Sequence, residues 1–241
     1  MIETRLLCLP HAGAGWIAFH SWLAVAPPEL EVLPVPMAGR DRRIFEKPHS
    51  DLHQAVRAIS GDVSSTLADE IPVVLFGHCL GGLLAYELAR CLLRDGVPVV
   101  QLMISGVAGP GYVRPQRITG LPDEEFLERV IEVGGYRNAA LDDREMRGLL
   151  LPALRADVQM QEDYRPQDCD PLDVPVMALR GEADETVSTE DIGQWREVTK
   201  AGFTVVELPG GHMYFLDQGP ALLDFALAAS QPRPVAQGGS Q

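Results

Sequence analysis

Cys79 stands at the centre of a six-residue segment, Gly77-His78-Cys79-Leu80-Gly81-Gly82, whose spacing suits a reactive turn. Read as G-x-C-x-G, the segment matches the nucleophile elbow, a sharp connection between a strand and a helix, with cysteine where serine is usual. Glycines on either side remove side chains that would clash, and the following helix N-terminus favours an anion. The same environment raises the thiolate fraction of a cysteine, so the pattern predicts that Cys79 is a covalent nucleophile.

Two further polar residues follow apolar runs late in the chain. Asp184 comes shortly after the run 175–180, and His212 shortly after the run 203–208. The order nucleophile, acid, histidine is that of the α/β-hydrolases. We therefore predict that His212 acts as general base and acid and that Asp184 orients it, with Glu182 and Asp217 as rival acids.

An acyl-transfer site also needs donors for a developing oxyanion. The backbone N–H of Leu80, directly after the nucleophile, is one candidate. The loop after the first strand supplies the other, which we assign to Ala12, with Gly13 as the alternative. Residues beside these groups are expected to contact the substrate: His11, Gly13, Met213 and Tyr214.

Short apolar runs alternate with helical patterns along the chain, which is typical of a mostly parallel sheet flanked by helices. Residues 1–229 are expected to form one domain, in which each candidate group lies just beyond the end of a strand, where open α/β sheets bind ligands. The predicted strands are 5–10, 30–35, 71–76, 99–105, 175–180 and 203–208. The predicted helices are 16–25, 50–67, 81–93, 190–200 and 218–228.

The segment 109–173 interrupts this alternation, because it contains helix patterns and no buried-strand run. Pro152 is expected to break or restart one of its helices. An insertion of this kind is more often a lid over a ligand cleft than a pair of extra packing helices, so we predict a helical lid. The polar, Pro/Gly-rich tail 230–241 is expected to be disordered.

Composition excludes several classes of protein. The 241 residues include 20 Lys+Arg and 34 Asp+Glu, a formal net charge of −14, which argues against nucleic-acid binding through cationic contacts to phosphate. No apolar run reaches the ~18 residues of a membrane span, and no signal-peptide core is present. The sequence thus predicts a cytoplasmic protein that does not bind membranes, with its four cysteines reduced.

Two alternative binding sites are weaker. The segment 13–18 fits a relaxed dinucleotide fingerprint, but Trp16 would crowd a pyrophosphate and no ribose-binding acid follows the second strand. A zinc site built from Cys79, His78 and His212 lacks a fourth ligand. We therefore expect neither a metal nor a cofactor.

Taken together, these motifs resemble the type II thioesterases, the free-standing α/β-hydrolases of nonribosomal peptide and polyketide pathways. The likeness extends to about Phe225. The resemblance implies a helical lid and a substrate held on the phosphopantetheine arm of an acyl or peptidyl carrier protein. We expect a monomer without its own cofactor. The matching segments are LPHAG (9–13), PMAGRDR (36–42), GHCLGG (77–82), LPALRAD (151–157), GEAD (181–184) and PGGHM (209–213).

Cys79 departs from this family pattern, in which serine is usual. An acyl-cysteine is itself a thioester, so it could be hydrolysed or could pass its acyl group to another thiol or an amine. We expect hydrolysis, with acyl or aminoacyl transfer between carrier proteins as the alternative. An engineered Ser-to-Cys change and a binding module with an inactive triad are further alternatives, and the presence of Asp184 and His212 speaks against the latter.

A basic patch follows the second strand. It consists of Arg40, Arg42, Arg43 and Lys47 in an otherwise acidic chain. Because carrier domains are commonly acidic, the three arginines are candidates for docking the carrier protein. A solvated loop whose arginines pair with local acids is the favoured interpretation.

Overall fold

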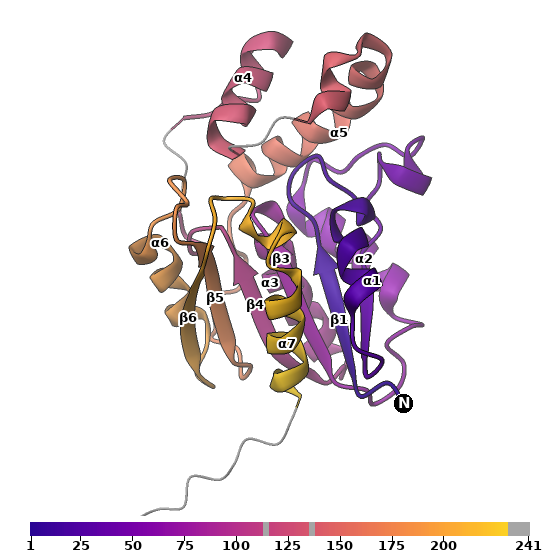
Figure 1. Cartoon of the computed structure of the whole chain (residues 1–241), viewed down its shortest axis with the longest axis vertical. Helices are drawn as coiled ribbons and strands as arrows, with labels where there is room; N and C mark the ends of the chain where they lie inside the picture. The colour runs from indigo at the N-terminus through magenta and orange to yellow at the C-terminus, as the bar shows by residue number, and fades with distance from the viewer. Residues whose placement is uncertain (113–115, 135–137, 231–241) are drawn as a thin grey trace, which may run out of the picture.

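Six strands form one sheet in the order β2-β1-β3-β4-β5-β6 (Figure 1). The computed structural model describes residues 1–112, 116–134 and 138–230. Every pairing within this sheet is parallel, so the predicted α/β architecture is confirmed. The strands are β1 (Thr4–Leu9), β2 (Leu30–Pro34), β3 (Val73–His78), β4 (Val99–Ser105), β5 (Val176–Gly181) and β6 (Phe203–Leu208).

The predicted strand positions agree with these bounds, and two of the six agree at both ends. The largest difference concerns β3, which begins and ends two residues later than predicted. Gly77 pairs with Leu9 of β1, and His78 pairs with Ser105 of β4, so the sheet continues up to the elbow. Neighbouring strands on both sides satisfy this backbone although glycine and histidine are not apolar strand residues.

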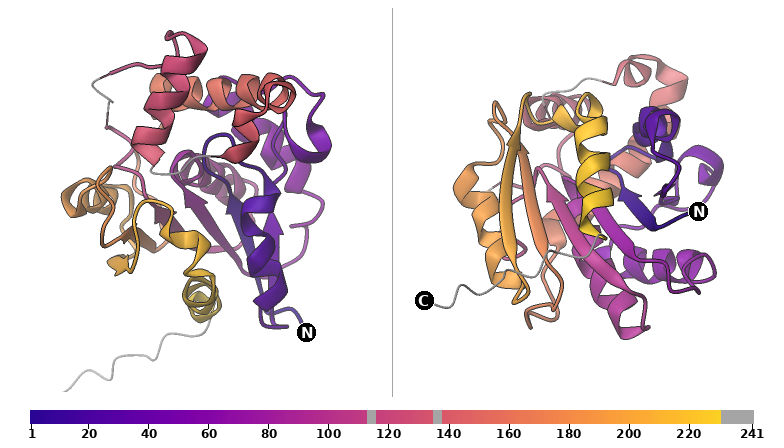
Figure 2. Two further views of the ribbon diagram at one scale, coloured as in Figure 1. Left: turned by 45° about the horizontal axis from the view of Figure 1, so that its top comes forward. Right: turned by 60° about the horizontal axis from the view of Figure 1, so that its bottom comes forward.

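Helices cover both faces of the sheet (Figure 2). Alternate strand residues point to opposite faces, and in β1 the last four residues, Leu6 to Leu9, are all apolar and buried. Leu7 and Leu9 pack in the core beneath α2, α3 and α6, whereas Leu6 and Cys8 pack beneath α1 and α7. These helices are α1 (His20–Val25), α2 (Leu52–Val63), α3 (Leu80–Arg94), α6 (Thr189–Gly193) and α7 (Gly219–Ala229).

Two predicted helices are shorter than expected because each is partly a 3₁₀ helix. The predicted helix 16–25 is a 3₁₀ turn, Trp16–Phe19, followed by α1. The predicted helix 190–200 consists of α6 and a second 3₁₀ turn, Gln194–Val198. Such turns are frequent at the ends of α-helices.

The insertion contains α4 (Asp123–Gly134) and α5 (Arg144–Asp163), which lie over the edge of the sheet where the strands end (Figure 1). We refer to these two helices as the upper lobe. The prediction that Pro152 breaks a helix was wrong, because α5 continues through it. Pro152 and Gly148 are both exposed, so the carbonyl that loses its donor can face solvent. The lobe has its own apolar core, formed by Phe126, Leu127, Leu151, Leu154 and Val158.

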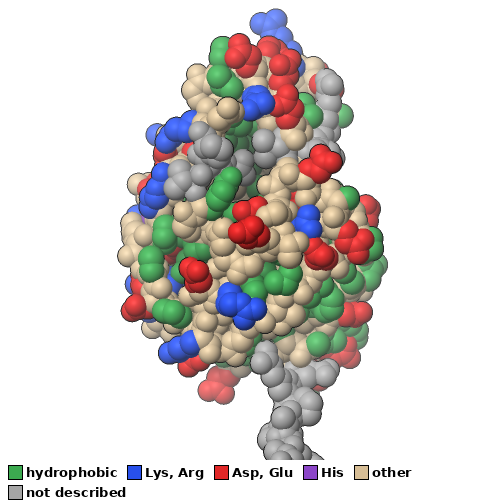
Figure 3. All heavy atoms as spheres, turned by 90° about the vertical axis from the view of Figure 1, so that its left-hand side faces the viewer, with side chains coloured by type: hydrophobic (Ala, Val, Ile, Leu, Met, Phe, Trp, Pro, Cys, Tyr) green, Lys and Arg blue, Asp and Glu red, His purple; other side chains and the backbone are tan. Residues whose placement is uncertain are grey.

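Charged residues of both signs are interspersed over the face shown in Figure 3. Among the described residues, no helix is long and apolar enough to cross a membrane. The predicted disordered tail falls almost wholly on residues 231–241, which lie outside the described residues.

Candidate functional site

The elbow holds Cys79 in a strained conformation between β3 and α3. Cys79 has φ 54° and ψ −118°, and it is one of two described non-glycine residues with positive φ. Left-handed φ is costly for a residue with a Cβ and is found preferentially at functional sites. The two flanking glycines allow the close approach, because a Cβ on Gly77 would lie 2.0 Å from the Gly81 carbonyl oxygen, and a Cβ on Gly81 would lie 2.1 Å from the Leu9 carbonyl oxygen.

Gly77→Ala is expected to destabilise the fold by about 3 kcal/mol, because the new methyl group meets backbone that cannot move independently of β3 and α3. The control is Gly61→Ala in the exposed surface of α2, where a Cβ meets nothing within 4 Å. This control should raise stability by about 0.5–1 kcal/mol through helix propensity. Equilibrium unfolding in urea measures both, and equal stabilities would contradict the packing argument.

Asp184 and His212 meet in the loops that follow β5 and β6. Asp184 Oδ2 lies 2.8 Å from His212 Nδ1, and both side chains are buried. Thr186 donates to Asp184 Oδ1 from its backbone N–H at 2.8 Å and from its hydroxyl at 2.7 Å. The rival acids Glu182 and Asp217 are exposed at the surface. Of the three candidate acids, Asp184 is therefore the one that contacts His212.

Electrostatics around His212 favour its charged form. Burial lowers the pKa of His212. The bond to Asp184 and the interaction with Cys79 together raise it by more than burial lowers it, so the pKa is about 9 instead of the usual 6.5. Burial alone would raise the pKa of Asp184, whereas its bonds with His212 and Thr186 bring it below the usual 3.8. His212 is therefore an imidazolium at neutral pH, and a neighbouring cation favours the thiolate form of a cysteine.

The loop after β1 is a tight turn, in which Ala14 N–H donates to the His11 carbonyl at 3.1 Å. Gly13, the third residue of this turn, has φ +76°, as a type II turn requires. Its N–H donates to Asp157 Oδ2 at 2.8 Å, so the alternative assignment of Gly13 as an oxyanion donor is wrong. Leu80 is the first residue of α3, where backbone N–H groups lack partners inside the helix.

Aromatic rings and a hydroxyl chain surround the histidine. His78 is fully buried, with its ring centroid 4.8 Å from that of His212 and 4.5 Å from that of Phe215. Ser105 Oγ lies 2.8 Å from His78 Nδ1 and 2.7 Å from the Tyr214 hydroxyl. Burial, followed by the charges of the neighbouring histidines, lowers the pKa of His78 well below 6.5.

The residues predicted to contact substrate lie around this cluster. The His11 ring lies edge-on to Phe215 with centroids 5.8 Å apart, and burial lowers its pKa to about 4. Met213 is half-buried beside His212 and packs against the core under α1 and α7. Tyr214 is buried, and its hydroxyl forms a hydrogen bond with Ser105. Its role as a substrate contact stays a prediction, as do those of the other three.

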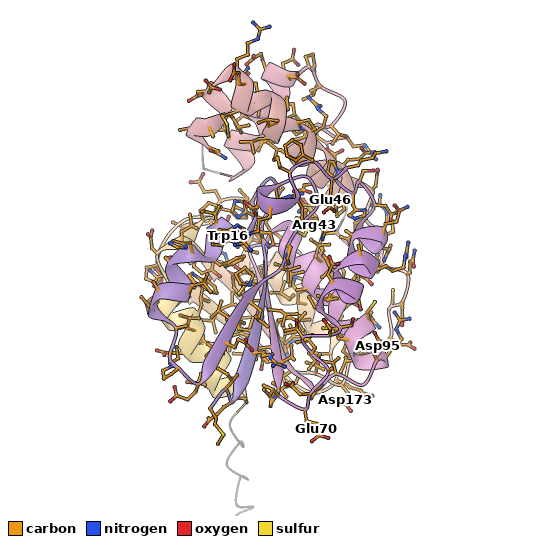
Figure 4. The ribbon with its side chains drawn as sticks, turned by 90° about the vertical axis from the view of Figure 1, so that its right-hand side faces the viewer. Trp16, Arg43, Glu46, Glu70, Asp95 and Asp173 are labelled. Carbon is orange, nitrogen blue, oxygen red and sulfur yellow. The ribbon has the colours of Figure 1, made fainter. Side chains whose placement is uncertain are left out.

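The structure divides the predicted docking patch, of which Figure 4 labels Arg43 together with its partner Glu46. Arg40 is buried and forms a two-pronged bond with Asp157, with N–O distances of 2.5 and 2.8 Å, so its assignment to an exposed docking surface was wrong. Arg43 bonds Glu46 and Asp62, as the solvated-loop interpretation expects. Arg42 is exposed, and its role in docking stays a prediction.

A family model described as "Thioesterase domain" matches residues 4–229. The chain belongs to this family. The gramicidin S biosynthesis protein GrsT of Aneurinibacillus migulanus is 33% identical over 225 residues, which are 92% of this chain and 87% of that protein. The type II thioesterase BorB from the borrelidin biosynthetic cluster is 31% identical with a TM-score of 0.85, over 95% of this chain and 93% of that chain.

A second solved relative, the type II thioesterase YbtT from the yersiniabactin NRPS/PKS pathway, is 26% identical with a TM-score of 0.83, and the match covers 95% of each chain. These comparisons confirm the predicted α/β-hydrolase fold and the predicted activity class, a thioesterase of the α/β-hydrolase superfamily. They also confirm the similarity to type II thioesterases of nonribosomal peptide and polyketide pathways.

Several polar residues around the site of this thioesterase were not predicted from the sequence. Thr186 contacts the predicted His212, and Ser105 contacts His78, yet isolated hydroxyl residues carry no pattern. Asp157 and Gln161 come from α5, and the Gln161 amide lies 3.9 Å from Cys79 Sγ. Arg40 and Asp157 did carry a signal, since each ends or lies within a motif of the resemblance, but their pairing spans 117 positions and is invisible to local patterns.

Proposed function

We propose that the protein hydrolyses acyl groups from the phosphopantetheine thioester of carrier-protein domains in nonribosomal peptide or polyketide biosynthesis, through an acyl-Cys79 intermediate. The observation that carries this proposal is the strained cysteine at the elbow, which interacts with a histidine that is itself paired with a buried carboxylate. The pathway and the carrier-bound substrate are inferred from relatives such as GrsT and YbtT.

Ser105 is the rival nucleophile, because its hydroxyl contacts an imidazole. Three features favour Cys79. Ser105 is completely buried, and its hydroxyl is engaged by both His78 and Tyr214. The carboxylate of Asp184 pairs with His212 and not with His78. Finally, the strained backbone and the helix N-terminus belong to Cys79, as an elbow nucleophile requires.

In the first half of the reaction, the Cys79 thiolate attacks the thioester carbonyl and forms a new C–S bond. The negative charge moves to the carbonyl oxygen, where the N–H groups of Leu80 and Ala12 stabilise it. The tetrahedral species collapses as the bond to the pantetheine sulfur breaks. His212, an imidazolium at neutral pH, gives its proton to that sulfur, and Asp184 holds the ring in place.

In the second half, neutral His212 accepts a proton from water as the water oxygen attacks the acyl-Cys79 carbonyl. The C–S bond to Cys79 breaks, the free acid leaves, and the thiolate and imidazolium are restored. If a second thiol or an amine takes the place of water, the same steps transfer the acyl group. The upper lobe, α4 and α5, serves as a lid over the acyl site, with the Gln161 amide beside the nucleophile.

Intact-protein mass spectrometry tests this proposal. The protein is mixed with an acyl-loaded carrier protein, either in buffer alone or with added unloaded carrier that bears a free pantetheine thiol. We expect free acid to accumulate in both samples at the same rate, with a transient adduct on the peptide that contains Cys79.

A persistent adduct that discharges only onto the added carrier would overturn hydrolysis and establish a transferase. Neither adduct nor free acid with any of a panel of acetyl, hexanoyl and aminoacyl carriers would contradict both functions. An adduct on Ser105 would support the thioesterase activity but would show that Ser105, and not Cys79, is the nucleophile.

A further inference from the structure

A buried side chain of the upper lobe reaches the loop that carries the proposed oxyanion donor. Asp157 lies on α5 and is completely buried. Its Oδ2 atom accepts the Gly13 N–H at 2.8 Å, in the turn His11–Ala14. Asp157 therefore joins a helix of the lobe to the backbone immediately after Ala12.

Arg40 completes this connection from the other side. It comes from the segment after β2, and its two terminal nitrogens bond both oxygens of Asp157. The same Arg40 Nη1 donates to the Ala14 carbonyl at 3.0 Å. The Gly13 N–H and the Ala14 carbonyl, two successive groups of the turn, are thus held by one buried ion pair.

The geometry of the turn explains how these bonds from Asp157 and Arg40 affect its backbone. The peptide between Ala12 and Gly13 is the central peptide of a type II turn, and the alternative type I turn differs mainly in the orientation of that peptide. Because Asp157 accepts its N–H, the carboxylate favours the type II orientation and fixes the backbone that carries the Ala12 N–H. The turn bond from Ala14 to His11 orients the preceding peptide.

Packing leads to the same conclusion. Ala12 contacts the main core beneath α2 and α3 and also the core of the upper lobe. Leu154, one helical turn before Asp157, lies so close to Gly13 that a Cβ there would be 2.8 Å from Leu154 Cδ1. One turn after Asp157, Gln161 reaches Cys79. One face of α5 thus contacts both the oxyanion loop and the nucleophile.

We propose that Asp157, held by Arg40, is a positioning residue that sets the oxyanion loop and makes the seating of α5 a condition for a formed oxyanion hole. A thioester would then meet a complete site only when the lobe is in place. This inference rests on the proposed function, because it takes the Ala12 N–H as an oxyanion donor.

The test compares Asp157→Asn, Arg40→Lys and the control Tyr164→Phe. Asparagine cannot accept from Gly13 and from both Arg40 nitrogens at once, and lysine loses the two-pronged contact. Tyr164→Phe removes a different buried bond of the segment after α5, 2.6 Å long, to Glu87 of α3, and leaves the bonds of Asp157 to Gly13 and Arg40 in place. Thermal unfolding is measured for each variant to confirm that it folds.

Three readouts are made on each protein. The first is hydrogen exchange of the Ala12 and Gly13 amides in the free protein. The second is the split between kcat and KM on an acyl-loaded carrier protein. The third compares binding of two substrate analogues, a trifluoromethyl ketone that forms an oxyanion with Cys79 and an unreactive thioether.

We expect Asp157→Asn to speed exchange of both amides and to lower kcat and ketone affinity by about 10- to 100-fold, with KM and thioether binding changed less than about 2-fold. Arg40→Lys should shift the same readouts in the same direction by less, so it tests the proposal even if Asp157→Asn does not fold. Tyr164→Phe should leave all of them within about 2-fold of wild type.

Amide exchange and kcat in Asp157→Asn or Arg40→Lys equal to those of Tyr164→Phe would overturn the positioning role. A wild-type protein that neither hydrolyses the thioester nor binds the ketone would instead contradict the proposed function. Because amide exchange is measured on the free protein, it still tests whether Asp157 fixes the loop.

Discussion

Replacing Cys79 with alanine is expected to lower kcat/KM for an acyl-loaded carrier protein by on the order of 10⁴- to 10⁶-fold. The elbow places this side chain at a helix N-terminus beside His212, so removing Sγ removes the atom that forms the covalent bond. Binding and the oxyanion donors remain and account for the residual rate. Free-acid release and covalent labelling, both followed by mass spectrometry, measure the loss.

Two control variants make this prediction specific. Cys91→Ala removes another partly exposed thiol, in the outer part of α3, and should leave kcat/KM within about 2-fold. Ser105→Ala removes the rival hydroxyl and should lower stability, because His78 and Tyr214 lose a shared buried partner, but the adduct on Cys79 should still form. Loss of the adduct in Ser105→Ala together with normal turnover in Cys79→Ala would reverse the assignment.

Asp184→Asn is expected to lower kcat on the order of 10⁴-fold. The hydrogen bond to Asp184 is the largest of the interactions that raise the pKa of His212 to about 9. Without the carboxylate, burial lowers this pKa, so His212 loses its proton near neutral pH and can no longer protonate the leaving sulfur. An NMR titration of the His212 ring, with the pH dependence of kcat, checks both effects.

The same pair predicts how stability depends on pH. His212 has a higher pKa in the folded protein, about 9, than its ordinary 6.5. Its contribution to the free energy of unfolding is therefore fully present below about pH 6.5 and is lost as the pH rises through about 9. Denaturant unfolding of the wild type should show this loss between pH 6.5 and 9, and the loss should be smaller in Asp184→Asn, which keeps only the interaction with Cys79.

Asp217→Asn is the matched control, because it makes the same change at a rival acid that lies exposed near the histidine in sequence. It should leave the His212 pKa unchanged and kcat within about 2-fold. A large loss of activity in Asp217→Asn, with Asp184→Asn nearly normal, would transfer the orienting role to the other carboxylate.

The sheet, the elbow and the order of Cys79, Asp184 and His212 could all be predicted from the amino-acid sequence. These features are local, because buried strands read as apolar runs and an elbow needs glycines at fixed spacing. Local patterns did not predict the end of β3, because its last two residues join the sheet only through bonds to β1 and β4.

Which polar side chains contact one another depends on the packing of the folded chain. Arg40 looked like a surface residue because its neighbours are charged, yet it is buried against Asp157, which comes from an inserted helix far along the chain. Ser105 and Tyr214 likewise join His78 from separate strand ends and loops. A buried charge requires a partner, but local spacing does not reveal which one, because long-range pairing depends on how helices and loops pack over the sheet.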